Sequence, residues 1–247
     1  MTTVEFSNQF DIHYNNIATN KAPGIDLYEK SVYLTKAQLE IVKNYYNPKG
    51  NKYQEGFEST EKRRNDLKNL IKNYVTSTVI NSDNKISESS VLFEIPNDTF
   101  LIIYEKAIIS SSDKCLDGIG VQVIPKTYDE YNIQINNPFK SPNSKNIWRL
   151  DYNDIPSKTV ELISKYSILK YQIRYIKYPK PIILVDLDND PEYSSDNLSI
   201  EGETNVMTCE LSSSIHDEIL DRAVQLAALD YKDGNLQSKV QLNNRNE

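Results

Sequence analysis

Two stretches of sequence decide the fold: Glu29-Lys-Ser-Val-Tyr-Leu-Thr-Lys-Ala-Gln-Leu-Glu-Ile-Val42 and, far along the chain, Cys209-Glu-Leu-Ser-Ser-Ser-Ile-His-Asp-Glu-Ile-Leu-Asp-Arg-Ala-Val-Gln-Leu-Ala-Ala228. Both carry apolar residues at helical spacing and are typical of amphipathic helices. A further helical stretch, Phe10-Asp-Ile-His-Tyr-Asn-Asn-Ile-Ala-Thr-Asn-Lys-Ala-Pro-Gly24, precedes them and should break at its Ala-Pro-Gly end. The residues between the two ends are mostly strand-like. The sequence therefore predicts a helical body that is split by a β-rich insertion.

The bulk composition is that of a globular but rather polar chain. Its 247 residues, 38% of them hydrophobic and 26% charged, fit one large domain or two small ones. The formal net charge is −7, whereas a general binder of nucleic acid usually carries a basic excess. The acidic balance indicates solubility, or a surface that DNA can pass without adhering. No signal peptide and no apolar run near the ~20 residues of a membrane span is evident.

The cysteines and the N-terminal helices support further local predictions. Cys115 and Cys209 lack CxxC spacing, which indicates reduced, structural thiols in a cytosolic synthesis compartment. Thr35 and Gln38 have capping-box spacing and predict a helix start, with the end of that helix at 47–50. A third helix is expected from residue 59 or 60. Its predicted buried face is Leu67, Leu70, Ile71 and Tyr74.

The middle of the chain reads as short strands. The expected strands are 91–95, 100–104, 120–124, 148–152, 159–163 and 169–178, with one short helix over 127–135. Asn97-Asp98 is a candidate hairpin turn between the first two strands. From Asp186 to Glu203 the chain is a polar, acidic loop without Lys or Arg.

These patterns predict an α+β fold. The helical body is built from N-terminal helices and a C-terminal helix, and the β-rich insertion is sandwich- or barrel-like. We expect an N-terminal helical segment over 1–76, an insertion over 77–209 that includes the acidic loop 186–203, a C-terminal helix over 210–231 that packs on the helical body, and a polar tail over 232–247.

The strand 169–178 alternates with period two. Tyr171, Ile173 and Tyr175 are expected on one face, and basic residues interrupt the aromatic ones. Three interpretations remain open: an ordinary sheet strand, a subunit interface, or a platform for single-stranded nucleic acid, against which the negative net charge argues. The candidate interface residues are Tyr171, Arg174, Tyr175 and Lys177.

No candidate catalytic or metal-binding motif has the residue spacing that its chemistry requires. Asp186-Leu-Asp-Asn-Asp190 begins like a calcium loop, but Pro191 and Asn197 occupy the positions of the required Gly and Glu. Two histidines, His13 and His216, cannot supply a metal set with unclustered cysteines. We therefore expect no catalytic, cofactor-binding or metal-binding residues, no cofactor, and a protein that is not an enzyme. A glycan hydrolase with unrecognised carboxylates is an alternative.

Three segments resemble virion structural proteins of crAss-like bacteriophages, which are phages with short tails. They are Phe10 to Tyr46, the stretch Tyr171-Gln-Ile-Arg-Tyr-Ile-Lys-Tyr-Pro-Lys-Pro-Ile-Ile-Leu184, and Glu210 to Asp230. The resembling protein is a neck or tail ring component, similar in role to head-to-tail adaptors and tail tubular proteins. The resemblance does not extend to residues 77–165.

The resemblance implies a virion protein of the neck or tail that works by assembly. It implies a homo-oligomeric ring of about twelve copies, connected to the portal or to neighbouring ring and tail proteins, through which genome DNA passes without sequence-specific binding. We expect no membrane partner and synthesis in the host bacterial cytoplasm. An accessory protein or assembly chaperone that is absent from the virion is the other alternative.

Overall fold

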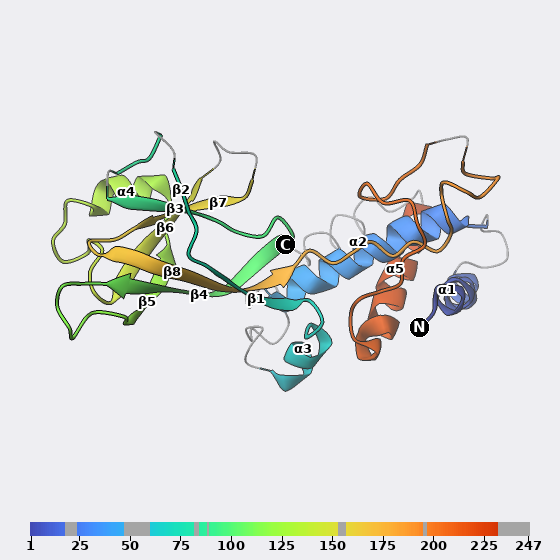
Figure 1. The fold of residues 1–247 in the computed structure, drawn as a ribbon. Helices are drawn as coiled ribbons and strands as arrows, with labels where there is room; N and C mark the ends of the chain where they lie inside the picture. The colour runs from blue at the N-terminus through green and yellow to red at the C-terminus, as the bar shows by residue number, and fades with distance from the viewer. Residues whose placement is uncertain are drawn as a thin grey trace. The chain divides into compact units, whose positions relative to one another are not determined.

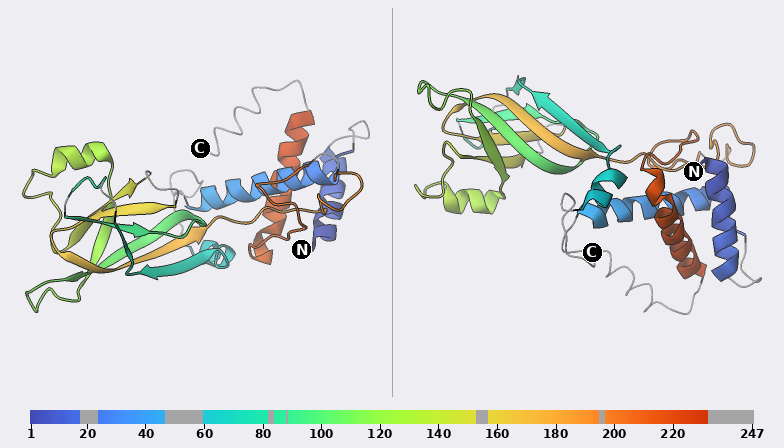
Figure 2. Two further views of the ribbon diagram at one scale, coloured as in Figure 1. Left: turned by 45° about the horizontal axis from the view of Figure 1, so that its top comes forward. Right: turned by 90° about the horizontal axis from the view of Figure 1, so that it is seen from below.

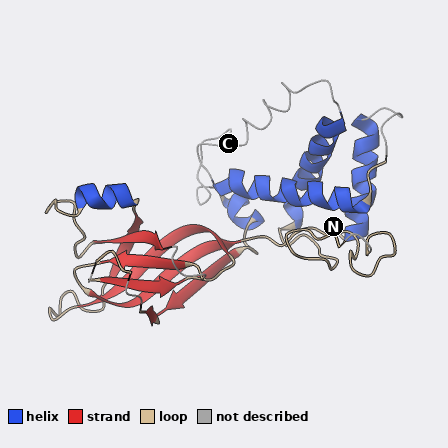
Figure 3. Cartoon of the chain, turned by 90° about the horizontal axis from the view of Figure 1, so that it is seen from above, coloured by secondary structure: helices blue, strands red, loops and turns tan. Residues whose placement is uncertain are grey.

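The structure is a computed structural model that describes residues 1–17, 24–46, 60–81, 84–87, 89–152, 157–194 and 197–231. The chain divides into two compact units. The helical unit comprises Met1–Leu70 and Pro179–Glu247, and the sheet unit comprises Ile71–Tyr178. Figure 3 shows the same division by secondary structure, with the strands gathered in one unit. The predicted α+β fold, with terminal helices and a β-rich insertion, is confirmed.

The helical unit is built from both ends of the chain. Its elements are α1 (Thr3–Ile17), α2 (Leu27–Tyr46), α3 (Glu61–Asp66), the short 3-10 helix η2 (Ser213–Ile215) and α5 (His216–Tyr231). Helix α5 packs against both α1 and α2, as all the ribbon views show (Figures 1 and 2). The shared core contains Phe6 and Phe10 of α1, Leu34 of α2, and Ile219 and Val224 of α5. Burial of these side chains is the main force that holds the two chain ends together.

The sheet unit is one mixed sheet of eight strands. In chain order they are β1 (Ile71–Thr76), β2 (Val79–Ile80), β3 (Ser90–Glu94), β4 (Thr99–Ser110), β5 (Gly120–Pro125), β6 (Asn146–Tyr152), β7 (Thr159–Ile163) and β8 (Ser167–Lys177). Their spatial order is β1-β8-β4-β5-β6-β7-β3-β2. All pairs are antiparallel except β5 with β6, which are parallel and joined through α4 (Tyr128–Gln134).

The sheet curls toward a barrel. Strands β1 and β2 stand at opposite edges of the strand order, yet only residues 77 and 78 separate them along the chain. Three Cα steps span at most ~11 Å, so the two edges must approach each other at this corner. The concave side encloses a hydrophobic core, which includes Phe93, Val121, Leu162 and Tyr171. The insertion is therefore barrel-like, and Figure 2 shows the curl.

Three local predictions were wrong. Helix α2 begins at Leu27, where the Asp26 carboxylate accepts a hydrogen bond from Glu29 N at 2.6 Å, so Thr35 and Gln38 lie inside the helix and do not cap it. Residues 71–76 form β1, not helix, because they pair with β8. Asn97-Asp98 does not close a hairpin, since β3 pairs with β7 and β2 while β4 pairs with β8 and β5.

The boundaries between the two units lie at Ile71 and at Pro179, whereas the sequence predicted domain boundaries at residues 77 and 210. The division of the chain into domains stays a prediction. The expected helix breaks at residues 22–23 and 47–50, and the polar tail 232–247, lie outside the described residues.

Candidate functional site

Polar clamps join the sequence-distant helices of the helical unit. Arg222 of α5 donates from Nε to Glu40 of α2 at 2.7 Å, and both side chains are largely buried. The Tyr45 hydroxyl of α2 donates a hydrogen bond to Glu218 of α5 at 2.9 Å. Burial raises the pKa of Tyr45, and this hydrogen bond raises it further. His13 of α1 lies 3.1 Å from Asp221 of α5. These contacts fix the rotation of α5 about its own axis relative to α1 and α2. Apolar packing alone would specify this rotation less tightly.

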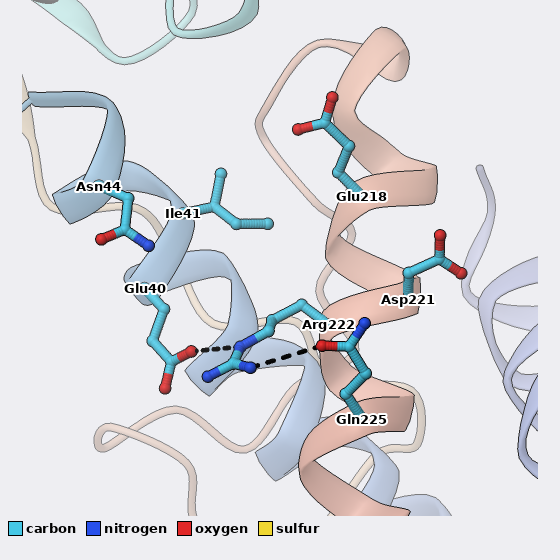
Figure 4. A pocket seen from close by; sticks show the side chains of 7 residues that line it. All are labelled: Glu40, Ile41, Asn44, Glu218, Asp221, Arg222 and Gln225. Atoms are coloured by element: carbon cyan, nitrogen blue, oxygen red, sulfur yellow. Dashed lines mark hydrogen bonds and ion pairs between the residues drawn. The ribbon is translucent and has the colours of Figure 1, made fainter. Parts of the chain in front are cut away.

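A groove of about 330 Å³ lies along these clamps between α2 and α5 (Figure 4). Its lining consists of Glu40, Ile41, Asn44, Glu218, Asp221, Arg222 and Gln225. The lining holds three carboxylates and one guanidinium, and it contains no Ser, Cys or Lys that could act as a nucleophile beside a base. Its polar groups connect the two helices, so its chemistry is that of a contact surface.

A buried polar row on α2 holds the returning chain in the helical unit. Ser31 accepts a hydrogen bond from Leu184 N at 3.0 Å. Thr35 accepts from Ile182 N at 3.0 Å and donates to the carbonyl of the same residue at 3.3 Å. Gln38 donates to the Lys180 carbonyl at 2.8 Å. We call these three α2 side chains the polar row.

The spacing explains why the polar row works. One helical turn rises about 5.4 Å, and two residues of an extended chain advance about 6.6 Å, so successive turns of α2 meet alternate residues of 180–184. The helix thereby supplies the partners that a neighbouring strand would give. Sequence reasoning missed this role. The available signal was a row of polar residues at i, i+4 and i+7 within an otherwise amphipathic helix.

The acidic loop 186–203 is organised by its own side chains. The Asp186 carboxylate accepts from Asp188 N, Asn189 N and Asn189 Nδ2 at 3.0–3.1 Å, and the Asn189 bonds lower the pKa of Asp186. Beyond it, Ile200 and Glu203 exchange two backbone hydrogen bonds around a tight turn. Among the described residues, His, Cys, Asp and Glu side chains nowhere gather in a group of three that could hold a metal ion.

The predicted interface residues fall into two classes. Tyr171 and Tyr175 of β8 lie on one face together with Ile173, as the alternation predicted, and this is the buried, concave face of the sheet. Arg174 is exposed on the opposite face and Lys177 is half-buried. The role of these four residues in subunit contacts stays a prediction.

A buried charged network ties three strands of the sheet unit. Arg149 of β6 donates to Glu105 of β4 at 2.5 Å, and the Tyr171 hydroxyl donates to the other Glu105 oxygen at 2.6 Å. Burial raises the pKa of Glu105, although Arg149 and the Tyr171 bond act in the opposite direction. Burial, with Glu105 nearby, also raises the pKa of Tyr171. Because Glu105 is bound through both of its oxygens, this network fixes the position of β4 relative to β6 and β8.

His216 is packed inside the helical unit. His216 lies at the start of α5 with its ring 5.2 Å from that of Phe6, and burial lowers its pKa. No described helix is both long and apolar enough to cross a membrane.

Comparison with known proteins gives one family and two relatives. Residues 1–239 match the family model described as Phage tail ring protein 3/4. The chain is 41% identical over 252 residues to Ring protein 4/5 of Bacteroides phage crAss001. It is also 41% identical over 248 residues to Ring protein 3 of the same phage. Each alignment covers 100% of this chain and 100% of the relative.

Proposed function

The chain belongs to the phage tail ring protein 3/4 family and has a structural role in the virion, and from this premise we propose that it forms a closed ring in the neck that connects the portal to the tail. The resemblance that rested on three segments is confirmed over the whole chain. The observation that carries the proposal is this full-length match, which includes both the helical unit and the sheet unit.

A ring of identical subunits needs two different, complementary faces on each copy, because head-to-tail contacts close only when one face meets the other. The two units of this chain offer surfaces of different kinds. The helical unit presents helix faces and the acidic loop, and the sheet unit presents the exposed side of a curled sheet. We assign the shared body of the ring to the helical unit, and the exposed Arg174 and half-buried Lys177 to contacts between copies.

The proposed role is mechanical rather than catalytic. Both relatives are named as ring proteins, which supports this assignment. About twelve copies would surround a channel through which genome DNA passes. A net charge of −7 favours passage over binding, because phosphate groups are repelled rather than retained by a chain with acidic excess.

Electron cryo-microscopy of purified virions tests the proposal. We expect a ring between capsid and tail whose subunit density accommodates the helical unit and the sheet unit, and whose symmetry gives the copy number. Mass spectrometry of the same particles, with the lysate of infected cells as a reference, should show this chain enriched in the particles. A chain that is abundant in lysate but absent from virions would be an assembly accessory, and the ring proposal would then be wrong.

A further inference from the structure

The outward face of the sheet unit combines positive charge with exposed apolar surface. Because Tyr171, Ile173 and Tyr175 point into the core, the alternate positions of β8 and of its neighbours β1 and β4 point outward. These positions bring Lys170 and Arg174 of β8 beside strand β4, whose Lys106 lies opposite Gln172. We call this surface the outer sheet face.

Among the described residues, the cations of the outer sheet face have no acidic partner. None of the ladder partners of these cations is an acid; the partners are Asn73, Tyr104, Ile108, Gln122 and Gln172. In the described part of the chain, no ion pair is formed by Lys106, Lys170 or Arg174. Val75 and Tyr104, which also point outward, are 54% and 52% exposed. A partner for this face must supply negative charge together with some apolar contact.

The acidic loop 186–203 has the complementary character. Seven of the 35 acids of the chain lie in this loop, and the 28 that remain equal the 28 Lys and Arg, so the loop accounts for the whole net charge of −7. Asp188 and Glu192 are exposed. Val206, just past the loop, is 48% exposed and adds apolar surface at its border. Backbone bonds between Ile183 and Met207 hold the two ends of this region together.

We propose that the outer sheet face of one copy docks on the acidic loop of a neighbouring copy, and that this contact is one of the head-to-tail contacts of the ring. The inference rests on the proposed ring function. It assigns the two complementary faces that such a ring requires to two specified surfaces of this chain. Lys106, Lys170 and Arg174 pair with carboxylates of the loop, while Val75 and Tyr104 contact the apolar border.

A second copy fits the outer sheet face better than DNA does. Lys170 and Arg174 are four residues apart on one strand, so they are separated by about 13 Å, and with Lys106 they form a sparse set of three charges. A DNA-binding face usually neutralises more phosphates and carries little exposed aliphatic surface. The loop offers a dense set of carboxylates with a hydrophobic border, which matches both properties.

Charge reversal of purified protein tests the contact. The face variant is Lys170→Glu with Arg174→Glu, the loop variant is Asp188→Lys with Glu192→Lys, and the combined variant carries all four changes. The matched control is Lys140→Glu with Lys145→Glu, which reverses two exposed lysines elsewhere in the sheet unit. Self-association is measured by sedimentation velocity, and circular dichroism confirms that each variant is folded.

We expect the face variant and the loop variant each to weaken self-association at least tenfold, and the combined variant to restore it. The control should associate like the unchanged protein, and added salt should weaken association of the unchanged protein. A face variant that associates normally, or a combined variant as weak as its parents, would overturn the proposal.

Zero-length crosslinking of amines to carboxylates in purified virions gives a second, independent readout. Crosslinks from Lys106 or Lys170 to peptides of 186–203 should form in virions and be absent from dilute, monomeric protein. If these lysines are instead shielded only in DNA-filled particles, and react freely once the particles are emptied, the genome occupies the face and the proposal is wrong. Virions that contain the ring but lack these crosslinks would refute this contact and leave the ring function standing.

Discussion

Replacement of Thr35 by valine tests how strongly the polar row of α2 holds the helical unit together. Valine has nearly the shape of threonine and keeps the β-branch, so helix propensity and packing change little. The variant loses the hydroxyl that accepts from Ile182 N at 3.0 Å and donates to the Ile182 carbonyl at 3.3 Å. Ile182 is fully buried, so both backbone groups are left without a partner and without water.

The expected cost follows from those two groups. Each buried polar group that loses its partner costs about 1–3 kcal/mol, and the carbonyl bond is the longer and weaker of the two. Together they should lower the free energy of unfolding of the helical unit by about 2–4 kcal/mol. The control, Thr35→Ser, keeps the hydroxyl and removes one methyl group, which costs about 1 kcal/mol.

The assay uses two probes because the chain has two units. Far-ultraviolet circular dichroism reports mainly the helical unit, and fluorescence of Trp148, the single tryptophan of the chain, reports the sheet unit. With a urea dependence of about 2 kcal/mol per M, the valine variant should shift the dichroism midpoint by about 1–2 M and leave the fluorescence midpoint in place. Equal midpoints for the valine and serine variants would refute the role of the polar row.

Three further predictions concern other parts of the chain. Burial raises the pKa of Glu105, so the contribution of Glu105 to the stability of the sheet unit is largest at acid pH. This contribution is lost as pH rises from the ordinary glutamate range through the raised pKa. Glu105→Gln should remove the pH-dependent contribution, which tryptophan fluorescence in denaturant titrations at several pH values would measure. Glu201 and Gly202 both have positive φ in a two-residue turn, so Glu201→Asn should stabilise the chain by about 0.5–1 kcal/mol, whereas Gly202→Ala should destabilise it by a similar amount, as measured by circular dichroism. Burial raises the pKa of Cys209 to about 11, so iodoacetamide at mildly alkaline pH should modify the exposed Cys115 far faster than Cys209, as peptide mass spectrometry would measure.

Each of these predictions has a result that contradicts it. A difference between the unchanged protein and Glu105→Gln that stays flat or grows with pH would contradict the assigned direction of the glutamate shift. Equal effects of asparagine at 201 and alanine at 202 would show that backbone conformation does not limit the turn. Equal alkylation of both thiols in the folded chain, with unfolded protein as the control, would show that Cys209 is accessible.

Local sequence patterns correctly predicted the elements whose conformation depends on neighbouring residues and not on distant segments. The alternation placed Tyr171, Ile173 and Tyr175 of β8 on one face, because period two is a property of the strand itself. The helix over 127–135 was predicted from Thr127, which does accept a hydrogen bond from Glu130 N in the structure. In both cases the physical cause lies within a few residues, where the sequence displays it.

Partners from distant segments caused the errors. Ile71 and Tyr74 fit a helical face, but pairing with β8 makes them part of a strand. Thr35 and Gln38 have the spacing of a capping box, yet their side chains bind residues 180 and 182, which lie far along the chain. For the same reason the sequence offered contact candidates without showing which were buried. The buried Tyr171 and the exposed Arg174 look equally available in a linear pattern.

The packing of α5 on α1 has a consequence for synthesis on the ribosome. Part of the cover over α1 arrives only with α5, as the contact between the rings of Phe6 and His216 illustrates. Roughly 200 residues separate the two helices, and translation at 5–20 residues per second takes ~10–40 s to deliver them. The sheet unit ends at Tyr178 and can fold during that interval, before the first helix of the chain has its partner. We therefore expect the nascent chain to fold from its middle outward, which leaves an interval in which chaperones can shield its N-terminus.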